Sequence, residues 1–412
     1  MFKVYKDRRV LVVGLLGFAS GVPLLLTSST LSLWLDTGYG LSRTQIGFFA
    51  LAMLPYAFKF VWSPLIDRLN IPVFGRIFGR RRGWLLFSQI SLMLSLVVLA
   101  NLNLAANIPL TAALVFCVSF FSATQDILLL TYQAERLGRN TYGAGEAMTV
   151  FGYRMGMVIG SAGALYIAGM YSWSLAYMVM ASLVFIGVIT TLSMEEPQVQ
   201  KSKESQLREE KARQYLNSHP KLKGWKAEVL AWFYGAVFCP FSDFMRQKIW
   251  LPALFLMFFY KLGDNLIGTM SNLFYVDLGF SKIDIANASK IFGMWAAIFG
   301  GFIAGVLINR IGMIRSLFWF AAVHGVATLM YIVMLKSGKS MSMLYLSIAI
   351  EQVTAGMRTT ALFSYQLTIT NLSYAATQLA LMTSLVHFGR TSCSSISGYM
   401  VDQLGWEDII AE

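Results

Sequence analysis

Charged residues are scarce in this sequence. Asp, Glu, Lys and Arg make up 13% of its 412 residues, whereas 56% are hydrophobic. Water-soluble globular domains carry roughly 25% charged residues, so a soluble fold is excluded for most of the chain. The composition predicts an all-α polytopic membrane protein, in which each apolar stretch of about 20 residues forms one spanning helix.

Cysteine is also rare: Cys117, Cys239 and Cys393 stand far apart, without paired spacing. This predicts neither a disulfide framework nor a metal site. The loops contain no nucleophile–base set, no cluster of metal-ligating residues and no phosphate-binding loop. We therefore expect no enzymatic activity, no metal and no cofactor.

Acidic residues are too few to balance the basic ones, which leaves a formal net charge of +12. The basic residues form short clusters between apolar stretches, so they indicate membrane topology rather than a nucleic-acid partner. With the amino terminus placed in the cytoplasm, only a few of them fall in outer loops, namely Arg43, Lys282, Lys290, Lys336 and Lys339. The predicted surroundings are a lipid bilayer, and the sequence does not indicate an oligomeric state.

The apolar stretches predict eleven spans. The first, Val10–Trp34, has 25 residues, too many for the apolar core of a cleavable signal peptide, and should remain as a helix. The segment Asp402–Trp406 is typical of a turn into a twelfth span, which the last six residues cannot form. In chain order the spans are predicted at 10–34, 45–66, 84–102, 109–132, 146–170, 173–193, 250–277, 286–308, 314–336, 341–368 and 374–402.

A polar segment divides the spans into two groups. We predict an amino-terminal six-helix bundle over 1–194, a cytoplasmic linker over 195–249 and a carboxy-terminal bundle over 250–412 that lacks its last helix. Within the linker, Val229–Phe241 is apolar but too short to span, which favours a helix lying on the inner leaflet. A buried re-entrant piece is the alternative.

The two bundles repeat one plan. A capping-box pattern precedes the second span at Ser42–Gln45 and the eighth at Ser281–Asp284. Small residues at every fourth position predict close helix packing in two spans, with Gly152, Gly156 and Gly160 in one and Gly293, Ala297, Gly301 and Gly305 in the other. Such internal repeats are typical of secondary transporters with a binding site near the membrane midplane.

Ionisable residues inside spans are costly unless they face a cavity or a partner, so each is a functional candidate. We interpret His324, alone among apolar neighbours, as an interhelical hydrogen-bonding residue. Lys59 and Arg154 lie in the second and fifth spans, and the others lie on polar stripes of four further helices, which suggest a water-filled cavity for a large polar, anionic solute. The stripes are Ser119, Ser122, Asp126 and Gln133; Lys261, Asp264, Asn265, Gly268 and Asn272; Glu351, Thr354 and Arg358; and Thr383, His387, Arg390 and Ser394.

A basic loop, Trp62–Trp84, lies between the second and third spans. It contains Asp67-Arg68 followed by Arg80, Arg81 and Arg82. It resembles the loop of major facilitator transporters in which such residues latch the two half-bundles together, and a weaker copy contains Asn309 and Arg310. A generic positively charged cytoplasmic loop is the alternative.

Motifs along the chain resemble one branch of the major facilitator superfamily, the AmpG muropeptide permeases. The matching segments are Gly17–Pro23, Phe58–Arg68, Gly79–Trp84, Ser122–Ile127, Gly143–Gly145, Gly152–Gly156, Tyr260–Asp264 and Ala376–Gln378, with Gly389-Arg390 after them. The resemblance implies a bacterial inner-membrane importer, driven by the proton gradient, of N-acetylglucosaminyl-1,6-anhydro-N-acetylmuramyl peptides for cell-wall recycling. Import of another bulky anion, such as an acyl-coenzyme A or a peptide, and a transport-dead sensor are the alternatives.

We assign hypothetical roles on this basis. Proton coupling is assigned to Asp126 and Glu351, and the latch to Asp67, Arg68, Arg80, Arg81, Arg82, Asn309 and Arg310. The substrate cavity is assigned to Lys59, Ser122, Gln125, Arg154, Lys261, Asp264, Asn272, Arg358, His387 and Arg390. Two residues depart from the family pattern. Leu130 replaces an expected second aspartate one turn after Asp126, and Arg358 adds a cation, so substrate choice is expected to differ.

Overall fold

The computed structural model describes residues 2–40, 49–197, 210, 238–260, 271, 274–275 and 278–386. Within these ranges the regular structure is helical and contains no strand, which confirms the all-α prediction. Seven helices of the described part are long and apolar enough to cross a membrane. They are Arg8–Tyr39, Arg80–Asn101, Ile108–Arg136, Tyr142–Met170, Trp173–Ser193, Asn287–Ile311 and Met313–Ser337.

The first half of the chain supplies the helices up to α11. They are η1 (Phe2–Lys6), α1 (Arg8–Leu26), α2 (Ser29–Tyr39), η2 (Phe49–Met53), α4 (Leu54–Phe58), η3 (Lys59–Val61), α5 (Ser63–Arg68), α6 (Phe74–Phe78), α7 (Arg80–Asn101), α8 (Ile108–Arg136), α9 (Tyr142–Val158), the π-helical η4 (Ile159–Gly163), α10 (Ala164–Met170) and α11 (Trp173–Ser193).

The second half begins with two short helices and continues with longer ones. They are α14 (Cys239–Met245), α15 (Trp250–Phe259), α17 (Lys282–Ile285), the π-helical η6 (Ala286–Phe292), α18 (Gly293–Ile311), α19 (Met313–Thr328), α20 (Met330–Ser337), α21 (Met341–Ile369) and η7 (Leu372–Tyr374). The apolar helix that contains η7 extends over Leu372–Val386.

The predicted span 45–66 is not one continuous helix. From residue 49 it consists of four short pieces, η2, α4, η3 and α5. Pro55 and Pro64 lie in the first turns of α4 and α5, and a proline has no N–H to continue the preceding helix. The break places Lys59 and Asp67 in different short helices.

Several predicted segments fall outside the described residues. They include the first capping box at Ser42–Gln45, most of the linker with its proposed interfacial helix, and the later parts of spans 250–277 and 374–402. Span 341–368 corresponds to the 29-residue helix α21, which is rich in buried polar residues and is not among the seven helices that are long and apolar enough to cross a membrane.

Glycines bring α1 and α9 into direct backbone contact. A Cβ on Gly152 would lie 1.9 Å from the Gly14 carbonyl oxygen, and one on Gly156 would lie 2.2 Å from that of Phe18. Only a residue without a side chain fits at such distances, so the predicted close packing is confirmed for this stripe.

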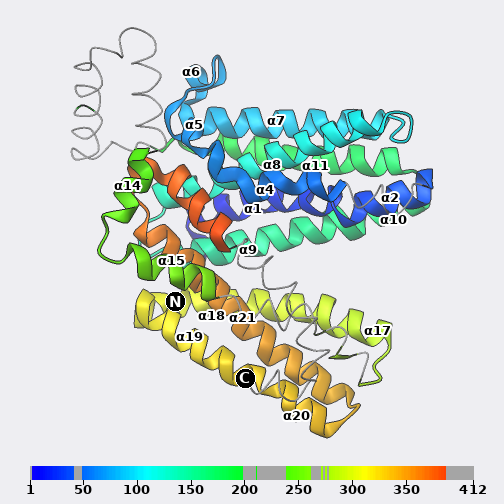
Figure 1. The fold of residues 1–412 in the computed structure, drawn as a ribbon, viewed down its shortest axis with the longest axis vertical. Helices are drawn as coiled ribbons and strands as arrows, with labels where there is room; N and C mark the ends of the chain where they lie inside the picture. The colour runs from blue at the N-terminus through cyan, green and yellow to red at the C-terminus, as the bar shows by residue number, and fades with distance from the viewer. Residues whose placement is uncertain are drawn as a thin grey trace.

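The two halves meet along α9, α18 and α21. A Cβ on Gly143 in α9 would lie 3.2 Å from the Gly305 Cα in α18, and the Tyr5 hydroxyl donates to the Phe302 carbonyl over 2.9 Å. In Figure 1 the helices of the first half lie side by side, and α18, α19 and α21 slant away from them toward the end that bears α17 and α20. The halves are closest at the opposite end, near α5 and α14.

Candidate functional site

Asp126 on α8 faces the interior of the first half. It lies beside Ser20 of α1 and within electrostatic reach of Lys59 in η3. Lys59 is 4% exposed, and a buried ammonium needs an anionic or strongly polar neighbour. Lys59 of η3 and Asp126 of α8 thus bring opposite charges within electrostatic reach of each other inside the first half.

Unpaired polar atoms surround this pair. Tyr56 of α4 faces Ser122 of α8, and Tyr153 of α9 faces Asp126. Four buried side-chain atoms of this group have no hydrogen-bond partner within the described residues: Tyr56 Oη, Ser122 Oγ, Gln125 Oε1 and Asp126 Oδ1. Buried polar atoms are normally satisfied, so the cluster is suited to hold water or a polar ligand.

Arg154 follows Tyr153 on α9 and is half-buried. It forms no hydrogen bond or ion pair with the part of the chain that the structure describes. Gln125, in contrast, donates its amide to Ser20 over 2.9 Å. The structure therefore brings the predicted cavity residues Lys59, Ser122 and Gln125 together with Asp126, which was predicted to couple protons. Arg154 lies on a neighbouring helix.

In the second half, polar residues of α21 contact other helices. Glu351 Oε2 accepts from the Tyr331 hydroxyl over 2.8 Å, and the Arg358 guanidinium lies 4.7 Å from the centre of the Tyr260 ring. The His324 Nδ1 and Thr354 Oγ1 atoms are 2.8 Å apart, which confirms an interhelical hydrogen bond. Five predicted cavity residues lie outside the described part: Lys261, Asp264, Asn272, His387 and Arg390.

Asp67 connects the two halves at the end where they are closest. Its carboxylate accepts from the backbone N–H groups of Ala376 and Thr377 over 3.1 and 2.9 Å, and from the Thr377 hydroxyl over 2.8 Å. These donors belong to the first turns of the helix Leu372–Val386, where backbone N–H groups lack intrahelical partners. Asp67 is thus an N-terminal cap supplied from the other half of the molecule.

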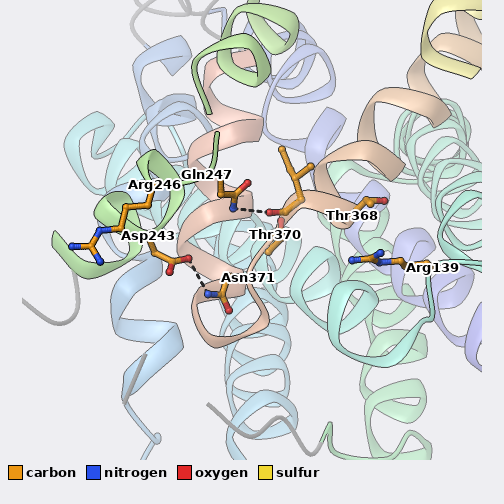
Figure 2. A pocket seen from close by; sticks show the side chains of 8 residues that line it. Arg139, Asp243, Arg246, Gln247, Thr368, Thr370 and Asn371 are labelled. Atoms are coloured by element: carbon orange, nitrogen blue, oxygen red, sulfur yellow. Dashed lines mark hydrogen bonds between the residues drawn. The ribbon is translucent and has the colours of Figure 1, made fainter. Parts of the chain in front are cut away.

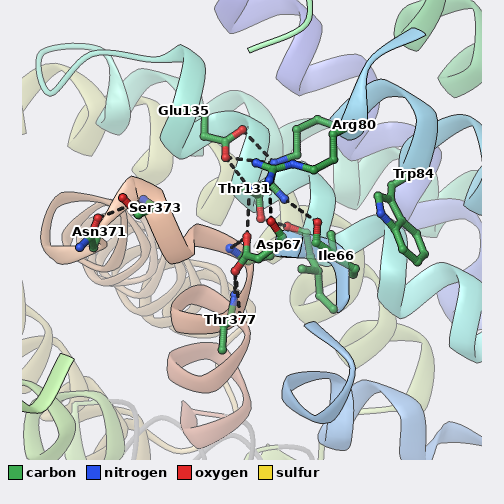
Figure 3. A network of polar contacts seen from close by, with 12 residues as sticks. Ile66, Asp67, Arg80, Trp84, Thr131, Glu135, Asn371, Ser373 and Thr377 are labelled. Carbon is green, nitrogen blue, oxygen red and sulfur yellow. Dashed lines mark hydrogen bonds and ion pairs between the residues drawn. The ribbon is translucent and has the colours of Figure 1, made fainter. Parts of the chain in front are cut away.

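Arg81 holds Asp67 in place from the opposite side. Its guanidinium pairs with Asp67 Oδ1 at 3.0 Å and with Glu135 Oε1 at 2.5 Å, and it is 1% exposed. Figure 3 shows Asp67 between Glu135 of α8 and Thr377 of the second half. One buried guanidinium therefore serves two buried carboxylates across three segments of the chain.

Among the other predicted latch residues, two arginines bond to backbone carbonyls near this network. Arg80 donates to the Asp67 carbonyl over 2.6 Å, and Arg82 donates to the carbonyls of Thr191 and Leu192 at the end of α11. The network itself is formed without Asn309 and Arg310, which are exposed at the end of α18.

Sequence reasoning missed two acidic residues. Besides Glu135, the Glu196 carboxylate accepts from the backbone N–H groups of Arg81 and Arg82 over 2.8 and 2.9 Å. An acidic residue at the end of a span, facing an arginine cluster, is the signal that could have identified both.

A pocket of about 480 Å³ opens at the same end of the molecule. It is lined by Arg139, Asp243, Arg246, Gln247, Thr368, Ile369, Thr370 and Asn371. Asn371 donates to Asp243 over 2.8 Å and Gln247 to the Ile369 carbonyl over 3.1 Å, so α14 is tied to the turn after α21 (Figure 2). Arg139 faces these residues from the loop between α8 and α9.

Residues 13–398 match the Major Facilitator Superfamily, which covers nearly the whole chain. The chain belongs to this superfamily. It is a multi-pass membrane transporter, and its fold of two helix bundles is that of the superfamily.

Its relatives within the superfamily carry more specific names. It is 32% identical to the anhydromuropeptide permease of Escherichia coli over 98% of this chain and 76% of that one. It is 30% identical to a putative transporter AmpG 4 of Rickettsia felis, over 98% and 93% of the two chains. These matches confirm the resemblance to the AmpG branch.

The fold agrees with that of solved major facilitator transporters. The crystal structure of FucP in the outward conformation matches with a TM-score of 0.69 at 14% identity, over 99% of this chain and 95% of that one. At this identity the match concerns the fold alone.

Proposed function

We propose that this transporter imports anhydromuropeptides from the periplasm, coupled to the proton gradient, across the bacterial inner membrane. The observation that supports this most is the group of unpaired polar atoms around Asp126 and Lys59, in a chain whose relative is an anhydromuropeptide permease. An anhydromuropeptide carries sugar hydroxyls, amides and peptide carboxylates. Hydroxyl, amide and cationic groups in one polar cluster match that chemistry.

We propose further that the end bearing Asp67 is cytoplasmic, as is the amino terminus, with halves at 1–194 and 250–412 joined by a linker at 195–249. The cap of Asp67 on the helix Leu372–Val386 closes this end. Asp67, Arg81 and Glu135 then stabilise the state that is closed to the cytoplasm, which is the state that accepts substrate from outside. Arg80 and Arg82 support the loop of the latch.

Coupling follows from the Lys59 and Asp126 pair. While Asp126 is ionised, it neutralises Lys59, and the buried ammonium is less available to a substrate anion. A proton on Asp126 leaves Lys59, with Arg154 nearby on α9, to bind a peptide carboxylate. Proton and substrate therefore favour each other's binding, as the thermodynamics of symport requires. Leu130, at the expected place of a second aspartate, leaves Asp126 as the carboxylate of this stripe.

Uptake of labelled anhydromuropeptide into proteoliposomes, with and without a proton gradient, tests the proposal. Wild type should accumulate the compound only with the gradient. Asp126→Asn should retain gradient-independent exchange and lose accumulation, whereas Asp36→Asn, at an exposed position in α2, should transport normally.

The same assay separates the alternatives. Accumulation of a labelled acyl-coenzyme A or peptide, but not of labelled anhydromuropeptide, would indicate a different bulky anion. Binding without exchange of any of these compounds would indicate a transport-dead sensor. Accumulation by Asp126→Asn equal to that of wild type would overturn the role of this carboxylate.

A further inference from the structure

Two tyrosines form a hydrogen-bonded chain that ends at Glu351. The Tyr275 and Tyr331 hydroxyl oxygens are 3.2 Å apart, and the Tyr331 hydroxyl donates to Glu351 Oε2 over 2.8 Å. Tyr331 belongs to α20, Glu351 to α21, and Tyr275 to the chain just before the turn that precedes α17. Three separate segments thus place three polar groups in one line.

The chain lies inside an apolar cluster. Tyr275 and Tyr331 are 2% and 3% exposed, and their rings stack with centres 6.2 Å apart and planes at 14°. The residues packed around them are Phe274, Phe280, Ile285, Ala288, Met334, Leu344 and Ile348. In such surroundings hydrogen bonds are strong and a lost partner is costly. Stacking fixes the two hydroxyls relative to each other.

The direction of the donors depends on whether Glu351 carries a proton. Ionised Glu351 only accepts, so Tyr331 donates to it, and the Tyr331 oxygen can accept from Tyr275. Protonated Glu351 can donate to Tyr331, whose hydrogen is then available to Tyr275. Both arrangements use the same oxygen positions, because a tyrosine hydroxyl both donates and accepts.

We propose that Tyr331 and Tyr275 relay a proton between Glu351 and the end of the molecule formed by α17 and α20. For each proton that reaches Glu351, the Tyr331 hydroxyl proton moves to the carboxylate, the Tyr275 proton moves to Tyr331, and a hydronium ion at that end of the molecule gives one proton to Tyr275 and becomes water. No bond other than O–H breaks. The relay of protons rests on the proposed proton-coupled function. The hydrogen bonds among Tyr275, Tyr331 and Glu351 do not depend on that function.

Other titratable groups near these helices are engaged or distant. His324 on α19 bonds to Thr354, Arg358 on α21 stacks over Tyr260, and Asp284 of α17 bonds to Ser281. On α20 and the turn after it, Lys336 and Lys339 are exposed. Lys261 and Asp264, on the same predicted span as Tyr275, lie outside the described residues.

The test compares Tyr331→Phe and Tyr275→Phe with Tyr345→Phe. Tyr345 packs edge-on against Phe292, beside the same cluster, and its hydroxyl has no hydrogen bond in the described structure. All three variants lose one hydroxyl and keep the ring, so their packing is matched. Infrared spectroscopy of the purified protein in lipid nanodiscs across a pH series, with the Glu351 carboxyl band assigned by Glu351→Gln, reports on the carboxyl without transport.

Tyr331→Phe should change both the frequency and the pH midpoint of the Glu351 band, and Tyr345→Phe should change neither. In proteoliposomes, Tyr331→Phe and Tyr275→Phe should lower gradient-driven uptake about tenfold and alter its pH profile, with gradient-independent exchange within about twofold of wild type.

An unchanged Glu351 band in Tyr331→Phe would overturn the hydrogen-bonded chain. A changed Glu351 band together with an unchanged pH profile of uptake would overturn the proton relay, although the hydrogen bonds among the three residues would be supported. If wild type showed no gradient-driven uptake at all, the proposed function and with it the relay would fail, and the infrared result would still decide the chain.

Discussion

At the scale of one residue, the positive charge of Arg81 balances two buried negative charges in the latch. Its side chain is buried and pairs with both Asp67 and Glu135. Removing one member of a buried ion pair leaves uncompensated charge, which costs about 3–5 kcal/mol. We expect Arg81→Ala to lower the free energy of unfolding by about this amount.

Arg80→Ala is the matched comparison, because Arg80 donates to a backbone carbonyl and leaves both carboxylates paired when it is removed. Its cost should be about 1 kcal/mol, that of one ordinary hydrogen bond. Denaturant unfolding in detergent measures both variants. Equal losses for the two would show that Arg81 is not the centre of the network.

At the scale of helices, the contact of α1 with α9 depends on glycine. Gly152→Ala would place a Cβ 1.9 Å from a backbone carbonyl oxygen, and backbone cannot move aside as a flexible side chain can. Overpacking of this kind costs about 1–3 kcal/mol. Gly169→Ala in α10, where nothing lies within 4 Å of the added carbon, should be neutral or slightly stabilising. Thermal unfolding of both variants tests the difference, and a neutral Gly152→Ala would contradict the packing.

The start of α17 is capped as the sequence predicted. The Ser281 hydroxyl donates to Asp284 Oδ2 over 2.7 Å, and the Asp284 N–H donates back to Ser281 over 3.2 Å. The side-chain bond from Ser281, and then the backbone bond, lower the pKa of Asp284 below its ordinary value of 3.8.

Because this pKa is lower in the folded state, the stabilisation is complete above about pH 3.8 and is lost as the pH falls through the folded-state pKa. Ser281→Ala should therefore lower the melting temperature at pH 7, and the difference from wild type should shrink below pH 3.8. A difference that stays constant over the pH series would exclude this ionic contribution.

At the scale of the whole molecule, we propose that Asp67 sets the balance between conformers. Asp67→Asn keeps the shape of the side chain but removes the charge that caps the helix Leu372–Val386. A charge-assisted hydrogen bond contributes about 1.5–3 kcal/mol, enough to change a conformer ratio by one to two orders of magnitude. We expect the halves to separate at this end.

Spin labels at Ile77 in α6 and Ile314 in α19, both more than 60% exposed, report the distance between the halves. Asp67→Asn should add a population at longer distance, whereas Asp36→Asn should not. Identical distance distributions for Asp67→Asn and wild type would remove Asp67 from the latch.

Much of this architecture could be predicted from the sequence, because its signals are local. Hydropathy over about 20 residues identified the long spans, spacing of four residues identified the Gly152 stripe, and a four-residue pattern identified the cap at Ser281. Hydropathy also predicted one helix over 45–66, although Pro55 and Pro64 divide it. An average over a window does not register the missing N–H of a single proline.

The sequence by itself determined that this protein is helical and spans a membrane, because burial of apolar stretches in lipid is decided residue by residue along the chain. It also marked Asp126, Glu351 and Asp67, since charge inside or beside a span is costly without a partner. Only the tertiary structure decided the partners: Lys59 for Asp126, the tyrosines for Glu351, and Thr377, 310 positions along the chain, for Asp67. Hydrogen bonds act over about 3 Å, and chain folding alone brings such distant residues within that range.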